Sequence, residues 1–341
     1  MGRTRWMLVA VASALAFGMS GTFVKPVLDA GWSAGAGSIV RTGIGTLILA
    51  VPTVRAMRGR WSLLWRHRLG LLLFGGVGIA GTQTSYFLAV SRIPVSTALM
   101  IEYLAPVLLV VATGIRMRRW PPLRVIGGAA LAMGGLLLVL DIAGGVALDP
   151  LGVGAAFTAA VVCAVYFQLS ATLPVPPLAL TGIGFFVATV VSGLLGVTRI
   201  VPVTVGSWTV DLFGSRVSAL VPLAVVVLIA TALAYTIEVA AAARIGPRPA
   251  SFLALTEVLF ATLTAALVLG QIPGPLQVAG GVVLLLGVVL VVSVPAPHRM
   301  PLEDGEPLPA SRPGAHVPPG HVPLSTPSRP RKRPKVASRG D

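Results

Sequence analysis

Charged residues are scarce in this chain, and their scarcity defines the class of protein. Only 11% of the 341 residues are charged and 55% are hydrophobic, whereas a soluble domain carries about 25% charged residues. The formal charge of +15 does not indicate a nucleic-acid partner, because the basic residues lie in short clusters between apolar runs and in the C-terminal segment. The composition therefore predicts an integral membrane protein in contact with the lipid bilayer.

Cysteine and histidine are also rare. The single cysteine, Cys163, excludes an internal disulfide framework. All four histidines lie outside the apolar runs, so we expect no metal site in the membrane. Sequence motifs of hydrolases, zinc enzymes and ATP-driven pumps are missing, so we predict that the chain is not an enzyme. The run GVGIAG, residues 76–81, lies within an apolar segment rather than between a strand and a helix, so we expect no nucleotide cofactor.

Apolar runs of membrane-spanning length dominate the rest of the chain. A helix needs about 20 apolar residues to cross the hydrocarbon core. The runs that meet this length are 5–24, 34–54, 69–90, 95–115, 122–140, 150–171, 178–198, 217–243, 250–270 and 275–294. The first run follows a basic start, as a signal peptide does, but it is long enough to span and we expect it to be retained. The prediction is an all-α polytopic membrane protein with ten transmembrane helices.

The basic residues predict the orientation, because cytoplasmic segments carry more arginine and lysine than external ones. If the N-terminus is cytoplasmic, the external segments contain only Lys25, Arg92, Arg199 and Arg216. The cytoplasmic segments then contain all the other basic residues outside the spans, including clusters at 55–68 and 116–124. We predict a multi-pass protein of the cytoplasmic membrane with both termini inside.

The chain repeats itself. PLRVIGGAALAMGG (122–135) returns as PLQVAGGVVLLLGV (275–288), and IPVSTALMIEYL (93–104) returns as RPASFLALTEVL (248–259). We predict two five-helix repeats, 1–141 and 142–294, followed by a disordered, proline-rich, basic cytoplasmic tail, 295–341. An odd number of spans inverts the second repeat, which is a transporter architecture. The glycines expected to form close helix contacts are Gly127, Gly134, Gly280 and Gly287.

These motifs resemble the EamA-type drug/metabolite transporter superfamily. The resemblance rests on the paired segments IPVSTALMIEYLAPVL and RPASFLALTEVLFATL and on the PLxVxGG starts of the fifth and tenth helices. Residues 233–271 are similar to the matching stretch of bacterial threonine/homoserine exporters. The resemblance implies ten helices around a central cavity and export of an amino acid, another metabolite or a drug. The chain departs from the family pattern at Phe17-Gly18, where Trp-Gly is common, and at Glu257-Val258, where Glu-Pro is expected.

Four charged residues lie well inside the spans: Arg41, Glu102, Glu238 and Glu257. A mid-membrane acid costs about 2.5–3.5 kcal/mol on insertion scales, so it indicates function. Three acids cannot all pair with one base, and an unpaired carboxyl can carry a coupling proton or bind a cation. The alternative is that the carboxyls are structural hydrogen-bonding groups between helices. Metal ligands are not expected among them.

Pro106 lies four residues after Glu102 and predicts a kink that frees a backbone carbonyl. The second repeat has Ala261 at that position, so we expect its helix to run straighter. Polar and aromatic side chains of the third and eighth helices complete the predicted substrate- or ion-binding set. They are Thr82, Ser85, Tyr86, Thr231 and Tyr235, with Tyr166 and Gln168 as weaker candidates.

The inverted repeat and the mid-membrane acids favour a secondary transporter that works by alternating access, and the resemblance implies that it moves a small metabolite, such as an amino acid or a related compound, outward. A drug or toxic-compound efflux carrier of the same fold is the first alternative. A membrane sensor or assembly protein is a further alternative, although paired mid-membrane acids in an inverted repeat are unusual for one. The expected partners are a small-molecule substrate, the lipid bilayer and a coupling proton or cation, without nucleic acid.

Overall fold

The computed structural model describes residues 2–93, 95–118, 120–139, 149–212, 214–269 and 272–294. The predicted tail, residues 295–341, lies outside the described residues. So does most of the connection between the two predicted repeats.

Ten helical spans make up the described part of the chain, as predicted. Nine are long and apolar enough to cross a membrane, and the tenth, Leu123–Val139, is shorter. The six uninterrupted spans are α1 (Arg3–Asp29), α2 (Ala34–Ala56), α8 (Leu123–Val139), α9 (Pro150–Thr172), α10 (Pro177–Val197) and α15 (Pro275–Ser293). Hydropathy predicts these segments well because the bilayer thickness dictates the length of each apolar run.

The other four spans are composite. The third consists of α4 (Arg68–Leu72), the π-helix η1 (Leu73–Gly81) and α5 (Thr82–Val90), and the short α3 (Ser62–Arg66) precedes it. The eighth consists of α11 (Leu220–Val227), the π-helix η2 (Leu228–Leu233) and α12 (Ala234–Ile245). The two π-helices begin 155 residues apart (228 − 73), the same offset as between Glu102 and Glu257 (257 − 102). The repeat thus extends to local helix geometry, and π-helical turns are frequent at functional sites.

The fourth and ninth spans are both broken. The fourth consists of α6 (Val95–Glu102) and α7 (Ala105–Met117), with Pro106 in the first turn of α7. The ninth consists of α13 (Pro247–Ala254) and α14 (Glu257–Leu269), so the prediction of a straighter helix there is wrong. The amides of Leu255 and Thr256 bond to carbonyls three residues back, and the Thr256 hydroxyl donates to the Leu253 carbonyl at 2.6 Å. Such side-chain to backbone bonds compete with the regular helix and can break it without proline.

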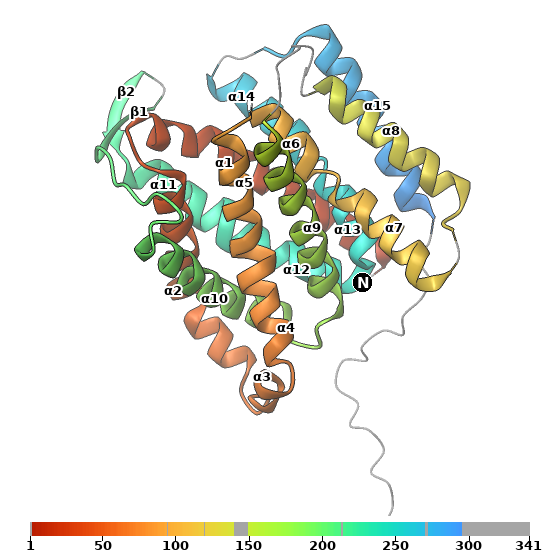
Figure 1. Cartoon of the computed structure of the whole chain (residues 1–341), viewed down its shortest axis with the longest axis horizontal. Coiled ribbons are helices and arrows are strands. Elements are labelled where there is room, and N and C mark those ends of the chain that lie inside the picture. The colour runs from red at the N-terminus through yellow and green to blue at the C-terminus, as the bar shows by residue number, and fades with distance from the viewer. Residues whose placement is uncertain are drawn as a thin grey trace, which may run out of the picture. The chain divides into compact units, whose positions relative to one another are not determined.

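Helices α8 and α15 lie side by side at one edge of the bundle (Figure 1). A Cβ atom added to Gly280 or Gly287 would collide with α8 backbone atoms, as predicted for these two glycines. On α8 the contacting glycines are Gly128 and Gly135. The prediction of Gly127 and Gly134 is wrong, because an added Cβ there would meet nothing within 4 Å. Helix α8 instead turns Gly128 and Gly135 toward α15. Each lies one position after the predicted glycine, about 100° around the helix.

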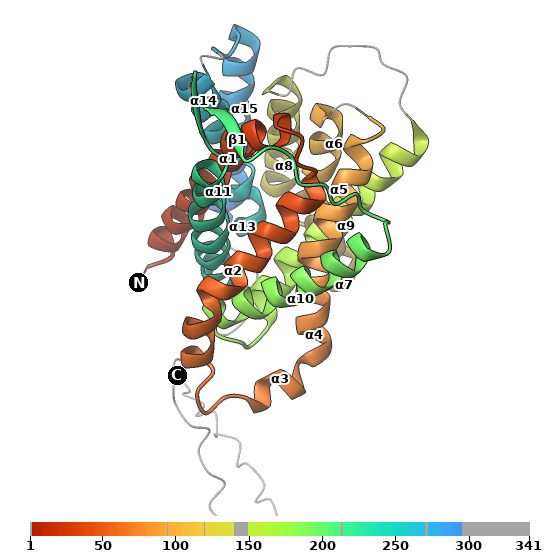
Figure 2. The same cartoon turned by 90° about the vertical axis from the view of Figure 1, so that its left-hand side faces the viewer.

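The two halves of the bundle interlock. Helix α1 of the first half packs against α12 and α14 of the second, and α9 of the second half packs against α5 and α6 of the first. Helices α2 and α10 form another contact between the halves (Figure 2). The interior where these helices meet therefore receives side chains from both halves.

A small β-hairpin caps one end of the bundle (Figure 1). Strands β1 (Thr209–Leu212) and β2 (Ser215–Ser218) pair antiparallel. The segment before β1 is bonded to the turn between α1 and α2: the Ser207 amide donates to the Ala30 carbonyl at 2.8 Å, and the Trp32 indole donates to the Ser207 carbonyl at 2.9 Å. Trp32 is buried against Trp208, with ring centroids 5.0 Å apart. The hairpin therefore joins the outer ends of helices from both halves.

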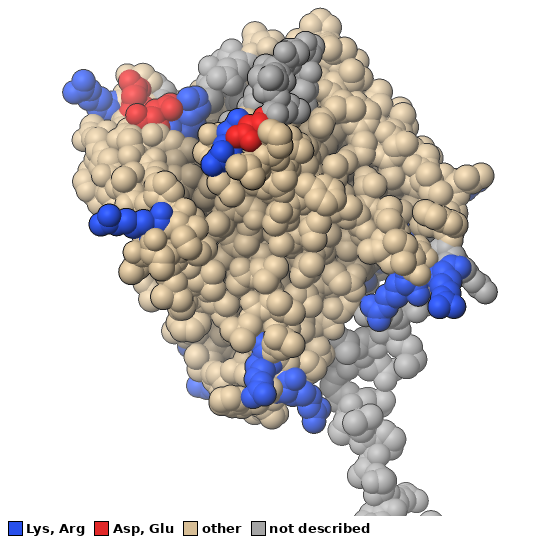
Figure 3. Space-filling view, in the orientation of Figure 1, with Lys and Arg blue, Asp and Glu red and all other residues tan. Residues whose placement is uncertain are grey.

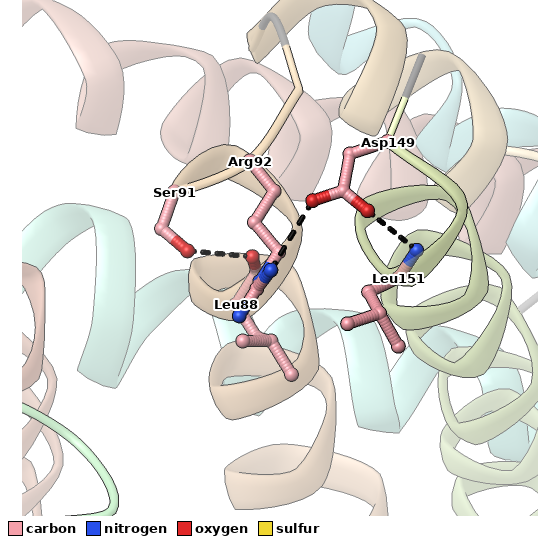
Figure 4. Close-up of polar contacts among 5 residues, drawn as sticks. All are labelled: Leu88, Ser91, Arg92, Asp149 and Leu151. Atoms are coloured by element: carbon pink, nitrogen blue, oxygen red, sulfur yellow. Dashed lines mark hydrogen bonds and ion pairs between the residues drawn. The ribbon is translucent and has the colours of Figure 1, made fainter.

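Acidic side chains are visible only at the hairpin end in the view of Figure 3, whereas the other end carries basic side chains alone. At the hairpin end, Asp149 caps α9: it accepts from the Leu151 amide at 2.8 Å and from Arg92 at 3.2 Å (Figure 4). The Leu151 amide and the Arg92 guanidinium hold the pKa of the Asp149 carboxyl below its ordinary value. This capping bond fixes where α9 begins, and the ion pair links it to the turn after α5.

Candidate functional site

The two helix breaks place the carboxyls of the repeat partners in the interior. Glu102 is the last residue of α6, and Glu257 is the first residue of α14. Both side chains are half-buried, and they lie close enough for their charges to interact. Within the described ranges, neither carboxyl accepts a hydrogen bond or forms an ion pair. Each is therefore available to a ligand or a proton.

Glu238 on α12 is held by a partner. Its side chain is only 7% exposed, and the hydroxyl of Tyr166 on α9 donates to its Oε2 at 2.7 Å. Burying a carboxyl is costly unless it is hydrogen-bonded. The Tyr166 hydroxyl thus offsets part of this cost and fixes the position of the Glu238 side chain.

Aromatic rings surround Tyr235, which lies one turn before Glu238 on α12. Its ring meets Phe17 of α1 at a centroid distance of 4.8 Å, Phe185 of α10 at 5.2 Å and Tyr166 at 5.9 Å, all edge to face. Such contacts stabilise packing by about 0.5–1.5 kcal/mol beyond area burial. They form one apolar aromatic wall built from both halves.

Arg41 joins the two halves beside this wall. Its Nε donates to the Thr231 hydroxyl at 3.1 Å, linking α2 to η2. The Thr231 hydroxyl in turn donates to the carbonyl of Val226, five residues back, at 2.7 Å. Arg41 also lies within charge-interaction range of Glu257 and Tyr235.

Two further tyrosines lie near the free carboxyls. Tyr86 on α5 and Tyr103, in the break between α6 and α7, are each within electrostatic range of both Glu102 and Glu257. Cys163 of α9 lies within the same range of all three carboxyls. Side chains that the sequence singled out on six different spans, the second, third, fourth, sixth, eighth and ninth, thus contribute to one region.

Two of the predicted residues are not tied to this cluster. The Thr82 hydroxyl donates to the Gly78 carbonyl of its own helix at 2.7 Å. Ser85 is half-buried, and its hydroxyl bonds to none of the charged side chains within the described ranges. For Gln168, a weaker candidate, only the backbone carbonyl is engaged among the described residues: it accepts from the Thr172 hydroxyl at 2.8 Å.

Sequence reasoning missed several residues of the site. Tyr103 follows Glu102 directly and could have been found by adjacency. Phe185 carries no signal of its own, because an aromatic in a span is usually a packing residue, and Phe17 was noted only as a departure from the Trp-Gly pattern of the family. A separate set of polar contacts between α2 and its neighbours was also missed: Ser38 bonds to Gln83, and the Thr189 hydroxyl donates to that of Thr42 at 3.0 Å.

The chemistry of the cluster follows from its charges. It brings together three carboxyls and one guanidinium, so a negative excess exists whenever all the carboxyls are ionised. The described residues contain no group of three or more His, Cys, Asp or Glu side chains arranged to hold a metal ion. Intramembrane carboxyls of this kind bind cations or carry protons in membrane proteins.

Ten spans in two similar halves, with ionisable groups in the interior, define a multi-pass membrane protein with the architecture of a transporter. The chain belongs to the EamA-like transporter family, whose model matches residues 4–141 and 150–293. It is therefore a membrane transporter with a small-molecule substrate, and not an enzyme.

One solved crystal structure of a protein resembles this chain with a TM-score of 0.68 at 20% sequence identity. The likeness covers 85% of this chain and 96% of the other. At this level of identity it shows a common fold and nothing more specific. No curated protein matches the sequence.

Proposed function

We propose that this protein is a secondary transporter that moves a small metabolite, such as an amino acid or a related compound, outward across the cytoplasmic membrane by alternating access. The observation that carries this proposal is the position of Glu102 and Glu257. Two repeat-related carboxyls, which have no hydrogen-bond partner among the described residues, lie at helix breaks, and inverted-repeat transporters bind their substrates at such interruptions near the membrane midplane.

The finer parts of the proposal rest on different features. The outward direction and the amino-acid-like substrate are supported by the similarity of residues 233–271 to bacterial threonine/homoserine exporters. The free carboxyls support coupling to a proton or another cation. The distribution of basic residues supports cytoplasmic termini. The proposed binding residues are those named from the sequence, including the weaker candidate Tyr166, which bonds to Glu238, with Tyr103 added because it lies near Glu102 and Glu257.

Efflux of drugs or toxic amphiphiles is the second candidate. The aromatic wall around Tyr235 favours it, because flat apolar compounds bind well against aromatic rings. The same site could serve either substrate class, so substrate identity has to be determined by transport.

A growth panel followed by flux measurement tests the proposal. Cells that express the protein and deletion cells are compared on amino acids, amino-acid analogues and toxic amphiphiles. We expect selective resistance in the expressing strain, and export of the protective compound from loaded proteoliposomes. The matched control is the Glu102→Gln/Glu257→Gln double variant at equal membrane abundance. If wild-type proteoliposomes move no compound of the panel faster than the control does, the transport assignment to this site is wrong.

A further inference from the structure

Two arginine side chains meet at the point where α1 begins and α15 ends. Arg3, in the first turn of α1, donates from Nη2 to the Val292 carbonyl at 2.9 Å. Arg248, in the first turn of α13, donates from Nη2 to the Val294 carbonyl at 2.9 Å. Val294 is the residue that ends α15. The two guanidinium groups are therefore held on carbonyls only two residues apart.

A third arginine joins this group from α12. Arg244 lies in the last turn of α12, and its guanidinium is 5.2 Å from the centroid of the Trp6 ring. Trp6 is three residues after Arg3, so these two side chains are neighbours on α1. Tryptophan rings are enriched at the level of the lipid headgroups. Arg3, Arg244 and Arg248 are called the arginine cluster below.

The positive charge of the arginine cluster exceeds what the end of α15 can balance. The C-terminus of a helix carries about half a negative charge, whereas the cluster carries three positive ones. Within the described ranges, neither Arg3 nor Arg248 forms an ion pair. The described acids outside the interior all lie toward the hairpin end of the bundle: Asp29, Asp149 and Asp211. An anion bound at the cluster would therefore reduce the repulsion among the arginines.

Most hydrogen-bond donors of Arg3 and Arg248 are not used by the bonds to α15. A guanidinium has five N–H donors, and each of these two gives one to a carbonyl of α15. The Arg248 Nε is buried and has no partner in the part of the chain that the structure describes, which is unfavourable for a polar group. Guanidinium groups bind phosphate oxygens through pairs of such donors.

The surface next to the cluster is apolar and faces the lipid. Val289 and Leu290 lie on α15 one turn before Val292 and Val294, and they are 62% and 40% exposed. Because α15 is long and apolar enough to span the membrane, these side chains contact acyl chains. The cluster thus lies at the end of a span, where the lipid phosphates are, with room for acyl chains beside it.

We propose that the arginine cluster binds the phosphate of an anionic phospholipid, whose acyl chains lie along Val289 and Leu290. Anionic lipids of the cytoplasmic leaflet attract basic residues near the surface, and the distribution of basic residues predicts that this end is cytoplasmic. The bound phosphate would connect α1 of the first half to α13 and α15 of the second. The site does not involve the transported compound, so this inference goes beyond the proposed function.

Lipid binding to the purified full chain tests the proposal. Phosphatidylglycerol, which is anionic, and phosphatidylcholine, which is zwitterionic, are compared with identical acyl chains in mixed detergent micelles. One readout is the melting temperature, and the other is the amount of each lipid retained after delipidation, measured by native mass spectrometry. Glycerol 1-phosphate carries a phosphate without acyl chains, so it distinguishes a lipid from a soluble anion.

We expect phosphatidylglycerol to raise the melting temperature more than phosphatidylcholine does, and to be retained at least about tenfold better, which corresponds to about 1.4 kcal/mol. The double variant Arg3→Gln/Arg248→Gln should lose most of this preference. The matched control Arg58→Gln/Arg60→Gln removes the same charge from two exposed arginines that follow α2 and should keep the preference.

The comparison is made between two lipids within each variant, so a change in basal stability cancels. If the double variant does not fold, Arg248→Lys replaces it. Lysine keeps the positive charge but loses the planar fork of donors, so this variant should keep only part of the preference for phosphatidylglycerol.

Equal effects of the two lipids would overturn the proposal. A preference that survives Arg3→Gln/Arg248→Gln, or that the control loses to the same extent, would also overturn it, because the charge would then act without a specific site. An equal shift with glycerol 1-phosphate would make the ligand a soluble anion instead of a lipid.

The acids of the tail are a further occupant that the experiment can identify. They are neutralised together in the variant Glu303→Gln/Asp304→Asn/Glu306→Gln. A preference for phosphatidylglycerol that appears only in this variant would mean that the acids of the chain itself, and not a lipid, are the natural partner, and would overturn the proposal. Transport is not measured here, so failure of this inference leaves the proposed function standing, and failure of transport leaves the lipid site standing.

Discussion

At the scale of single residues, the three interior carboxyls have two different surroundings. Glu238 is buried and hydrogen-bonded to Tyr166, which is how a structural carboxyl is accommodated. Glu102 and Glu257 are half-buried and lack partners within the described residues. The sequence identified all three as mid-membrane acids but could not separate them. The difference depends on Tyr166, which is 72 residues away from Glu238 and reaches it only through the packing of α9 on α12.

Substituting the free carboxyls should abolish function while leaving the fold intact. Gln keeps the shape of Glu but cannot ionise, and neutralising a mid-membrane acid removes an insertion cost of about 2.5–3.5 kcal/mol. Glu102→Gln and Glu257→Gln should therefore insert and melt near the wild-type temperature, yet lose most of the initial flux or its dependence on pH in proteoliposomes. Wild-type flux with wild-type pH dependence in both variants would show that these carboxyls are structural.

The Tyr166–Glu238 pair should behave in the opposite way and report on stability. Tyr166→Phe removes the hydroxyl and leaves a buried carboxyl without its donor, which costs about 1–3 kcal/mol. Glu238→Gln keeps an acceptor for the hydroxyl and should cost less. Thermal melting of both single variants and the double variant in detergent gives the coupling between the two sites. Strictly additive effects would mean that the hydrogen bond contributes nothing to the fold.

At the scale of elements, hydropathy predicts where the spans lie but not how they are broken or rotated. At the break before Glu257, the Thr256 hydroxyl bonds to the Leu253 carbonyl, but the Thr264 hydroxyl makes the same kind of bond within the unbroken α14, so a threonine alone does not predict the break. Which glycines of α8 contact α15 depends on how α8 is rotated about its own axis, and an alignment of the two repeats does not determine that rotation. Gly128 and Gly135 face α15, although Gly127 and Gly134 are the aligned partners of Gly280 and Gly287.

Neighbouring glycines of α8 offer a matched test of this rotation. Gly→Ala within a helix gains about 0.8–1.0 kcal/mol of helix propensity at either position. At Gly135 the new Cβ would collide with backbone atoms of Leu284 and Gly280, whereas at Gly134 it would meet nothing within 4 Å. Gly134→Ala should be neutral or stabilising, and Gly135→Ala should lose about 1–3 kcal/mol through overpacking. If Gly134→Ala lowered the melting temperature more than Gly135→Ala, the result would support the sequence prediction that Gly134, and not Gly135, faces α15.

The cap of α9 should give a stability contribution that depends on pH. The pKa of Asp149 is lowered in the folded protein, first by the Leu151 amide and then by Arg92, so the ionised carboxylate stabilises the fold above the unfolded pKa of about 3.9, and this contribution is lost as the pH falls through the folded pKa. Asp149→Asn keeps an N-cap side chain but removes the charge that pairs with Arg92. Melting from neutral to acidic pH should show a wild-type advantage that disappears in acid. An advantage that is constant with pH would argue against the ion pair.

At the scale of the whole molecule, the described acids outside the interior gather in the segments at one end of the bundle. The described acids outside the interior, Asp29, Asp149 and Asp211, all lie in segments predicted to be external, where the basic residues are few. Figures 1 and 2 place the β-hairpin and α3 at opposite ends of the bundle. The fold therefore makes a definite statement about which residues share a side of the membrane, whichever side is the cytoplasm.

Cysteine labelling in intact cells shows both which positions share a side of the membrane and which side is the cytoplasm. In a Cys163→Ala background, single cysteines replace Ser91 and Ser215 near the hairpin end and Ser62 and Trp120 near the other end, all of which are exposed. An impermeant thiol reagent added outside should label the first two and not the last two, and permeabilisation should expose all four. The opposite pattern would invert the orientation while leaving the fold intact. Labelling of only one member of either pair would contradict the shared ends, because two spans separate Ser62 from Trp120 and four spans separate Ser91 from Ser215.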